Sequence, residues 1–288
     1  MVSVLQAIKA SNTHQLCTVI LHADGLSVRW EDESKSLQAS VFLRKELFVE
    51  YEVPWLRKEF GLQLGLLVDT LHVFTAGTAE LVLRYPGANQ ELICEMTEEG
   101  AGGVLCTYAS LDSMEVEPPR DLVGFWEGPE SFFLVPGAMM KEVIDDMEWG
   151  AVSKSVEVLM QRSPPRIVLS SRGIGGLLIT LPVGQLTSVQ CATPEVRQIY
   201  KHKHLKTAFA HLPQSKDASA SMGTKVTLDS QGMIKVSHML SLGGAEARGG
   251  HYTSEAAYQD SQRVAEQQRV SMVQFLILPE DAGEDDEL

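Results

Sequence analysis

Apolar and polar residues alternate along most of the first 112 positions, in short runs bounded by Gly, Pro, Asp or Asn. An alternation with a period of two predicts half-buried strands, and the bounding residues predict hairpin turns between them. Ala-Asp-Gly at 23–25 is one such turn signal. The predicted strands are LCTVILHA, LSVRWE, LQASVFLR, ELFVEYEV, ELVLRYPG, ELICEMTE and GGVLCTYASLD.

Two stretches in this first half have helical spacing instead. The first places three apolar residues on one face: Val4, Leu5 and Ile8. The second is more apolar and predicts a helix with Leu62, Leu66, Leu67, Leu71, Val73 and Phe74 directed inward.

The second half repeats this plan. A strand, SFFLVP, leads through a proline at a plausible first helical position into a helix with Met139, Met140, Val143, Ile144 and Met147 inward. Strands are then predicted at SVEVLMQ, RIVLSS, GGLLITLP and EVRQIYKHKH, followed by a short helix, LKTAFAHL, and by strands KVTLDS, GMIKVSHML and VSMVQFLILP. Each half therefore has about eight strands and two short helices, an internal duplication of architecture without residue identity.

Two segments stand apart from this pattern. Residues 112–130 are acidic, contain proline and lack a clean periodicity, which is typical of a linker. Residues 241–270 are polar and rich in Gly, Ala and Gln, and we interpret them as a long insertion between the last two strands.

The composition is that of a globular protein: 288 residues, 44% hydrophobic and 22% charged, enough for two domains. No run reaches about 18 uncharged apolar residues, and the best candidate, 62–76, contains Asp69 and His72, so no membrane span is expected. The start of the chain lacks the basic segment of a signal peptide. The four cysteines form no CxxC pattern, which favours reduced thiols in an intracellular protein.

The net charge of −14 disfavours a protein that coats nucleic acid indiscriminately, but the charge is unevenly distributed. Residues 131–240 carry 12 Lys and Arg against 8 Asp and Glu, a balance of +4, whereas the rest of the chain carries −18. The last nine residues hold six acids and are interpreted as a solvated tail. Five lysines lie on or next to the predicted short helices: Lys9, Lys141, Lys201, Lys203 and Lys206. They are either solubilising side chains or one surface that attracts a polyanion.

Three patterns that resemble catalytic or ligand sites are weak. Gly-Ile-Gly-Gly at 173–176 precedes a β-rich run rather than a helix, which favours a hairpin turn over a dinucleotide site. Glu31, Asp32 and Glu33 lie in a polar hairpin tip, where carboxylates are solvated. His202 and His204 alternate on a predicted strand face, but the neighbouring lysines oppose a bound cation. We therefore expect no catalytic residue, no metal and no cofactor.

The residues also resemble a known family. The run GLSVRWEDESKSLQASVFLRKELFVEYEV at 25–53, followed by LGLLVDTLHVFTAG at 64–77, is similar to the DNA-sliding-clamp superfamily, which includes proliferating cell nuclear antigen. Within it, the chain resembles the Rad-one subunit family of the nine-one-one DNA-damage checkpoint clamp. The matching positions are the Gly-Leu-x-Val hairpin opening, Gln38-Ala39, Phe42-Leu43, Leu47-Phe48, Glu50-Tyr51 and the helix Leu66-Leu67-x-Asp69-x-Leu71-x-x-Phe74, and the acidic ending LPEDAGEDDEL is similar to clamp C-termini.

This resemblance implies an α+β sliding-clamp fold, with two pseudo-repeated domains that each have antiparallel sheets outside and two short helices inside. The expected boundaries are 1–111 for the first domain, 112–130 for the interdomain connector, 131–279 for the second domain with its insertion at 241–270, and 280–288 for the acidic tail. Family members begin with a further strand ahead of the first helix. Either the start codon is assigned downstream of the true one, or the first domain lacks that strand and leaves its neighbour unpaired.

The resemblance also implies functional surfaces. The lysines named above would meet DNA phosphates without reading sequence. Ring closure would use strand pairing near 104–111 and 176–181, through Val104, Leu105, Tyr108, Leu111, Leu177, Leu178, Ile179 and Leu181. Partner proteins would dock at the connector, on Met114, Val116, Leu122, Val123, Phe125 and Trp126.

The function implied is a non-enzymatic subunit of a nuclear heterotrimeric checkpoint clamp. Its expected partners are two related clamp subunits, an ATP-dependent clamp loader, double-stranded DNA, and repair and checkpoint proteins. Three alternatives stay open: a homotrimeric replication processivity clamp, a 3′→5′ exonuclease that uses carboxylates such as Glu31 and Glu33, and a β-rich interaction module with no DNA role.

Overall fold

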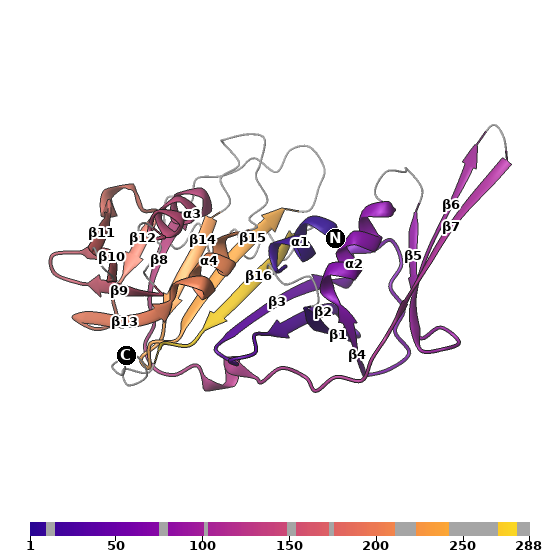
Figure 1. Ribbon diagram of the computed structural model, residues 1–288, viewed down its shortest axis with the longest axis horizontal. Helices are drawn as coiled ribbons and strands as arrows, with labels where there is room; N and C mark the ends of the chain where they lie inside the picture. The colour runs from indigo at the N-terminus through magenta and orange to yellow at the C-terminus, as the bar shows by residue number, and fades with distance from the viewer. Residues whose placement is uncertain are drawn as a thin grey trace. The chain divides into compact units, whose positions relative to one another are not determined.

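The computed structural model describes residues 1–9, 15–74, 80–100, 103–148, 154–172, 176–210, 223–241 and 270–280. These residues belong to two compact units (Figure 1). Unit 1 consists of Met1–Trp30 and Phe42–Pro119, and unit 2 consists of Glu31–Val41 and Arg120–Leu288. The predicted insertion at 241–270 and the acidic tail at 280–288 lie almost entirely outside the described residues. In the described part of the chain, no helix is long and apolar enough to cross a membrane.

Unit 1 contains two helices that pack against each other, α1 and α2, and two groups of antiparallel strands (Figure 1). The first group has the order β2-β1-β4, and the second has the order β5-β6-β7. The strand β3 is divided between the two units, and a short 3-10 helix, η1, follows it. The bounds are α1 Val2–Ala7, β1 Leu16–His22, β2 Gly25–Glu31, β3 Leu37–Arg44, η1 Lys45–Leu47, β4 Arg57–Gln63, α2 Leu64–Val73, β5 Leu81–Arg84, β6 Glu91–Gly100 and β7 Gly103–Asp112.

Unit 2 also contains two packed helices, α3 and α4, with strands in the orders β12-β8-β14-β15-β16 and β11-β10-β9-β13. All pairings given within these two groups are antiparallel. The bounds are η2 Leu122–Phe125, β8 Ser131–Pro136, α3 Gly137–Asp146, β9 Ser155–Gln161, β10 Arg166–Arg172, β11 Gly176–Leu181, η3 Val183–Gln185, β12 Ser188–Gln190, β13 Glu195–Lys201, α4 His202–Ala210, β14 Gly223–Leu228, β15 Ile234–Ser241 and β16 Val270–Ile277.

The predicted internal duplication is confirmed by the order of elements. In each unit a helix precedes three strands and a fourth strand, and a second helix then precedes three final strands. Thus α1, β4, α2 and β5 of unit 1 correspond to α3, β13, α4 and β14 of unit 2. Unit 2 has one further strand, β8, which leads directly into α3 and pairs with β14 on one edge and β12 on the other. The described part of unit 1 has no strand in this place.

The helices are held by apolar faces that the sequence predicted in part. Val4, Leu5 and Ile8 of the first helical stretch are at most 1% exposed, as expected. The prediction for the second helix was wrong at two positions, because Leu66 and Val73 are 50% and 62% exposed. Only the side of α2 that bears Leu67, Val68 and Leu71 faces the core, and Leu62 lies on β4 rather than on the helix.

Two further predictions of secondary structure were wrong. ELFVEYEV was expected to be a strand, but its first residues complete η1 and the rest is irregular, and the strand that follows, β4, was not predicted. EVRQIYKHKH was expected to be a strand throughout, but β13 ends at Lys201 and α4 begins at His202. Both His202 and His204 are buried on α4, where they face the core because it excludes water from the inner side of the helix.

The predicted hairpin turns are confirmed where the structure describes them. β1 and β2 pair from Thr18 opposite Arg29 to His22 opposite Gly25, so Ala23 and Asp24 form a two-residue turn. Gly25 has φ +150°, and a Cβ atom there would lie 2.3 Å from the Leu43 carbonyl oxygen. A glycine is therefore required at this point by both conformation and space. β10 and β11 also form a hairpin, as expected for Gly-Ile-Gly-Gly, although residues 173–175 lie outside the described part.

Candidate nucleic-acid interface and assembly surfaces

The strongest group of basic residues lies at the start of α4. Lys201 ends β13, Lys203 is exposed on the first turn of α4, and Lys206 follows one turn later. Lys206 Nζ donates a hydrogen bond of 2.5 Å to Glu148 Oε2, and this bond lowers the pKa of the Glu148 carboxyl. The described residues give no ion pair to Lys201 or Lys203. Because exposed ion pairs are weak, Lys206 is also available to a polyanion.

Lys141 lies on α3, beside α4, but its surroundings are acidic. It pairs with Asp145 one turn along, and Glu142 and Asp146 are exposed on the same helix. Residues 137–146 thus carry one basic and three acidic side chains. A phosphate approaching α3 would meet a net negative charge, so the expectation that each inner helix contributes positive charge does not hold for α3.

Lys9 lies in unit 1, just beyond the end of α1. Its ammonium group is 3.7 Å from Asp69 of α2 and is partly buried. α1 itself bears no charged residue, and α2 bears Asp69 and His72. The helices of unit 1 therefore present little positive charge, and the basic surface that the structure brings together is the one formed by Lys201, Lys203 and Lys206, here called the α4 basic cluster.

The two histidines considered as metal ligands have structural partners instead. His202 Nε2 is 2.8 Å from the Ile144 carbonyl oxygen, which links α4 to α3. His204 is 2% exposed, and its Nε2 lies 3.2 Å from Asp32 Oδ2. Within the described residues, no group of three or more His, Cys, Asp or Glu side chains is arranged to hold a metal ion.

Asp32, in the acidic hairpin tip, is held in place rather than free in solvent. Its Oδ1 accepts hydrogen bonds from the amides of Ser36 at 2.8 Å and Leu37 at 2.7 Å. Burial alone would raise the pKa of the Asp32 carboxyl, but the His204 ring, the Ser34 hydroxyl and the Leu37 amide outweigh it and hold the pKa well below its usual range. Glu31 lies 3.9 Å from Lys35, and Glu33 is exposed. The expectation that all three carboxylates are simply solvated was therefore wrong for Asp32.

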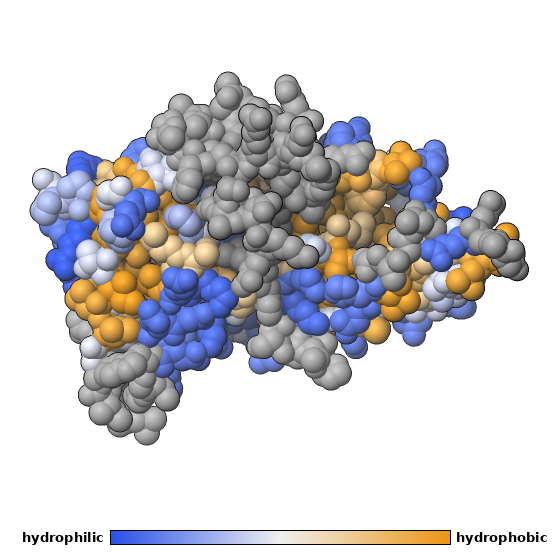
Figure 2. Space-filling model, turned by 90° about the horizontal axis from the view of Figure 1, so that it is seen from above, coloured by the Kyte–Doolittle hydropathy of each residue, from blue (hydrophilic) through white to orange (hydrophobic). Residues whose placement is uncertain are grey.

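The two strands expected to close a ring both lie at the edge of a sheet. β7 is the last strand of β5-β6-β7, and β11 is the first of β11-β10-β9-β13. On β7, Val104, Leu105 and Tyr108 are all more than half exposed, and Figure 2 shows apolar residues at the β6–β7 end of the molecule, on the right. On β11, Leu178 is 58% exposed, while Leu177 and Ile179 are half-buried. Apolar edges of this kind are the surfaces on which another chain adds a strand.

Two residues predicted for these edges are directed into their own units. Leu111 is 5% exposed and Leu181 is 2% exposed, so their side chains contribute to the core rather than to an outer surface. The alternation along each strand explains this, because successive side chains point to opposite faces of a sheet.

The connector residues divide into a fixed part and an exposed part. Met114 bridges to Gly61 of β4, and Leu122 is buried with Met233 and Leu276. Trp126 packs under the Lys235 ammonium group at 4.1 Å and donates from its ring nitrogen to Glu130 at 2.7 Å. By contrast, two apolar residues of η2 are exposed to solvent, Val123 at 59% and Phe125 at 64%. Exposed apolar side chains on a well-anchored turn are typical of a docking surface.

Gly61 determines how the start of the connector lies on β4. Its amide donates to the Met114 carbonyl at 2.8 Å, and a Cβ atom at Gly61 would lie 2.2 Å from Val116 Cγ1. We expect Gly61→Ala to lower the free energy of unfolding by about 1–3 kcal/mol, because the connector must move to make room. Urea denaturation measures this effect.

The matched control is Gly184→Ala, because a Cβ atom at Gly184 has no neighbour within 4 Å. This control should change the stability by less than about 0.5 kcal/mol. Equal stability of the two variants would show that the connector does not pack closely on β4.

Comparison with solved structures finds clamps that match nearly the whole chain. PCNA from Thermococcus kodakaraensis has a TM-score of 0.65 at 16% identity and covers 97% of this chain and 95% of its own. A PCNA2–PCNA3 complex from Sulfolobus tokodaii has a TM-score of 0.64 at 17% identity, covering 96% and 94%. Proliferating cellular nuclear antigen from Entamoeba histolytica has a TM-score of 0.67 at 15% identity, covering 97% and 94%. These likenesses show the sliding-clamp fold, an α+β architecture of antiparallel sheets and few helices.

Comparison with curated protein sequences found no match. Comparison with family models gives a match over residues 1–240, which are most of the chain, to the family described as repair protein Rad1/Rec1/Rad17. The match extends through both units and includes both edge strands, the connector and the α4 basic cluster. The chain therefore belongs to the Rad1/Rec1/Rad17 family of repair proteins and has the sliding-clamp fold.

Proposed function

We propose that this protein is a non-enzymatic subunit of a heterotrimeric ring that encircles duplex DNA at sites of damage in the nucleus. The ring would be placed on DNA by an ATP-dependent loader and would serve as a platform for checkpoint and repair proteins. The observation that carries the proposal is the α4 basic cluster, a local concentration of positive charge on a protein whose net charge is −14. Its lysines suit contact with phosphates without sequence preference.

The edge strands support assembly into a ring. β7 and β11 belong to different units and both expose apolar residues, so one subunit offers two different edges to its neighbours. Unlike edges favour head-to-tail contacts, which form a ring when the rotation closes. The similar solved complex of PCNA2 with PCNA3 contains two different clamp chains, which supports a ring of related but distinct subunits.

Native purification of the full chain from its own cells tests the proposal. We expect two further clamp-like chains to co-purify, in a particle of the mass of one copy of each. Size-exclusion chromatography with light scattering on the chain alone should then give a monomer. A stable trimer of this chain alone would favour the homotrimeric processivity clamp instead.

The edge strands allow a direct test of ring closure. We expect Tyr108→Asp or Leu178→Asp to prevent co-purification of one neighbour each, because a buried unpaired carboxylate at a sheet edge is strongly unfavourable. Each side chain is more than half exposed, so the isolated chain should keep its melting temperature. Leu56→Asp is the control, because Leu56 is 92% exposed and lies on neither edge. Loss of assembly in the control, or none in the edge variants, would contradict the proposed geometry.

The exonuclease alternative has a separate readout. Incubation of the purified protein with single-stranded ends and Mg²⁺ should release no nucleotides. Degradation that disappears when Glu31 and Glu33 are both changed to alanine would show that the protein is an enzyme.

A further inference from the structure

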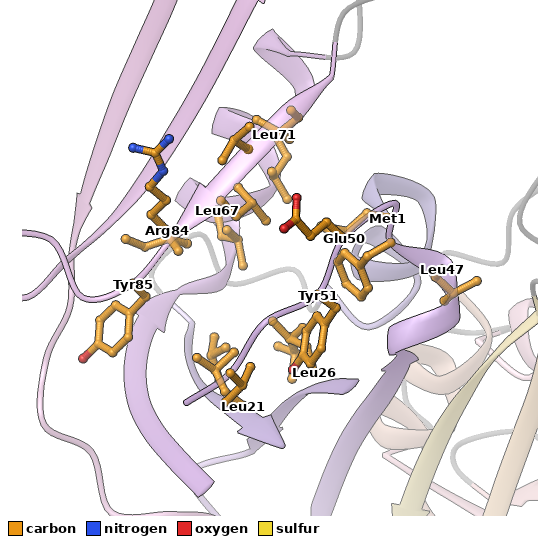
Figure 3. Close-up of a pocket in the computed structure, with 18 of the residues that line it drawn as sticks. Met1, Leu21, Leu26, Leu47, Glu50, Tyr51, Leu67, Leu71, Arg84 and Tyr85 are labelled. Atoms are coloured by element: carbon orange, nitrogen blue, oxygen red, sulfur yellow. The ribbon is translucent and has the colours of Figure 1, made fainter. Parts of the chain in front are cut away.

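Unit 1 contains a deep groove of about 1040 Å³ next to β5 (Figure 3). One wall is β5 itself, from Leu81 to Tyr85, and the opposite wall is the segment 47–55. The floor is apolar and comes from the strands β1 and β2 and the helix α2. Among its residues are Leu21, Leu26, Leu67 and Leu71, which surround the open space in the close-up.

The backbone along this groove is free to pair. β5 pairs antiparallel with β6 from Leu81 opposite Met96 to Arg84 opposite Ile93, and it is the end strand of its sheet. Within the described residues no strand pairs with its other edge, which borders the groove. Backbone amides and carbonyls of such an edge are a template for an added strand.

Unit 2 shows what occupies the same place in the duplicated plan. β14 corresponds to β5, and on the edge away from β15 it pairs antiparallel with β8, from Gly223 opposite Pro136 to Leu228 opposite Ser131. The four central residues of β8 are at most 5% exposed: Phe132, Phe133, Leu134 and Val135. The place next to β14 is thus filled by an extended apolar strand, whereas the place next to β5 is open.

The charges around the groove restrict the chemistry of an occupant. Three exposed carboxylates line it, those of Glu50, Glu52 and Glu80. The one arginine that lines it, Arg84, lies 3.3 Å from Glu95 of β6 and is thereby neutralised. An entering segment therefore meets an apolar floor with a negative rim, which favours apolar residues flanked by lysine or arginine.

From these observations we propose that the groove accepts an extended segment of a partner protein, which adds to the free edge of β5 as an antiparallel strand. The segment has apolar residues that fill the groove and basic residues on both sides of them. Main-chain hydrogen bonds to β5 would supply part of the affinity, and the apolar floor and acidic rim would supply selectivity. This site lies on neither the α4 basic cluster nor the ring-closing edges, and it does not depend on ring formation.

A peptide probe tests the proposal with the full chain. The probe is residues 131–135, SFFLV, the segment that fills the corresponding place in unit 2, with two lysines added at each end and a fluorescent label. We expect saturable binding by fluorescence anisotropy. Hydrogen exchange should show slowed amide exchange in residues 81–84 on binding. A peptide in which the central residue is proline should bind at least tenfold more weakly, because proline removes a main-chain donor and disfavours the ladder.

Charge variants of the chain provide the second arm. The triple variant Glu50→Lys, Glu52→Lys and Glu80→Lys should bind the lysine-flanked probe about tenfold more weakly and a glutamate-flanked probe more tightly. The matched control changes three exposed acids elsewhere, Glu33, Glu115 and Glu117, to lysine and should leave the affinity unchanged. Absence of saturable binding, equal binding of the proline peptide, or slowed exchange confined to residues outside β5 would each overturn the proposal.

Discussion

Changing Lys201, Lys203 and Lys206 together to glutamate is expected to weaken binding of the assembled ring to duplex DNA by about 10²–10³-fold near 0.1 M salt. Each lysine that meets a phosphate releases a counterion, so three lost contacts flatten the slope of log K against log salt by about 2.7. The binding that is left should be equally weak on all sequences, because phosphate contacts carry no sequence information. A salt titration by fluorescence anisotropy measures both quantities.

Two controls separate this effect from a general change in charge. The variant Lys35→Glu, Lys45→Glu and Lys58→Glu makes the same change in net charge away from α4 and should retain most of the affinity. Lys141→Glu alone should have a smaller effect than any single lysine of the α4 basic cluster, because Glu142, Asp145 and Asp146 already make α3 acidic. An affinity and salt slope unchanged in the α4 variant would show that DNA does not contact this surface.

The second large effect expected is on stability in acid. Lowering the pH from 7 to 5 should reduce the free energy of unfolding by about 2 kcal/mol through His238 alone. This side chain is fully buried in unit 2, where burial lowers its pKa to about 4 from the usual 6.5. Its ring nitrogens lie 2.8 Å from the Thr224 hydroxyl and 2.8 Å from the Ala208 carbonyl, and the rings of Phe209 and Phe275 pack against it.

The direction follows from the order of the two pKa values. Below pH 6.5 the unfolded chain takes up a proton on this histidine, whereas the folded chain stays neutral until about pH 4. The unfolded state therefore binds more protons over this interval, and stability is full above pH 6.5 and decreases as the pH falls. Asp32, whose pKa is lowered, contributes its own loss only at lower pH, below the ordinary range of an aspartate.

Urea denaturation at several pH values measures this dependence, with His238→Gln as the comparison. Glutamine donates to the Ala208 carbonyl and accepts from Thr224 as the neutral histidine does, but it does not titrate. The variant should lose about 2 kcal/mol less than the wild type between pH 7 and pH 5. His22 also has a pKa lowered by burial and by the nearby Arg57 and Arg29, but it is near the surface and is present in both proteins. An identical pH dependence in the two proteins would contradict the assignment to His238.

Most of the fold was predictable from local patterns. Alternation identified the strands that now form β1–β3 and β5–β7, and the apolar spacing of Val4, Leu5 and Ile8 identified α1. The errors occur where a short segment satisfies two patterns. ELFVEYEV alternates like a strand, but it has no partner in the described sheets, so it remains irregular. His202 and His204 fit one face of a strand as well as one side of a helix, and the packing of α4 on α3 favours the helix.

The candidate sites were predictable to a smaller degree. The sequence identified lysines near each inner helix, but it did not show that Lys9 faces Asp69 or that α3 surrounds Lys141 with acids. It placed Leu111 and Leu181 on edges that the structure confirms, yet their side chains face inward. The groove beside β5 had one signal, the expected strand ahead of the first helix. Its volume, apolar floor and acidic rim are set by segments far apart in the chain, and no local pattern contains them.

The sequence by itself determined the alternation of strands and helices, the duplication of the plan, the uneven distribution of charge and the resemblance to a clamp. These properties depend on neighbours within a few residues, because strand and helix periods are local. The tertiary structure decided which lysines share a surface, which edges stay open and which histidines are buried. Those outcomes depend on residues that pair across long stretches of chain, such as Asp32 with His204 and β8 with β14.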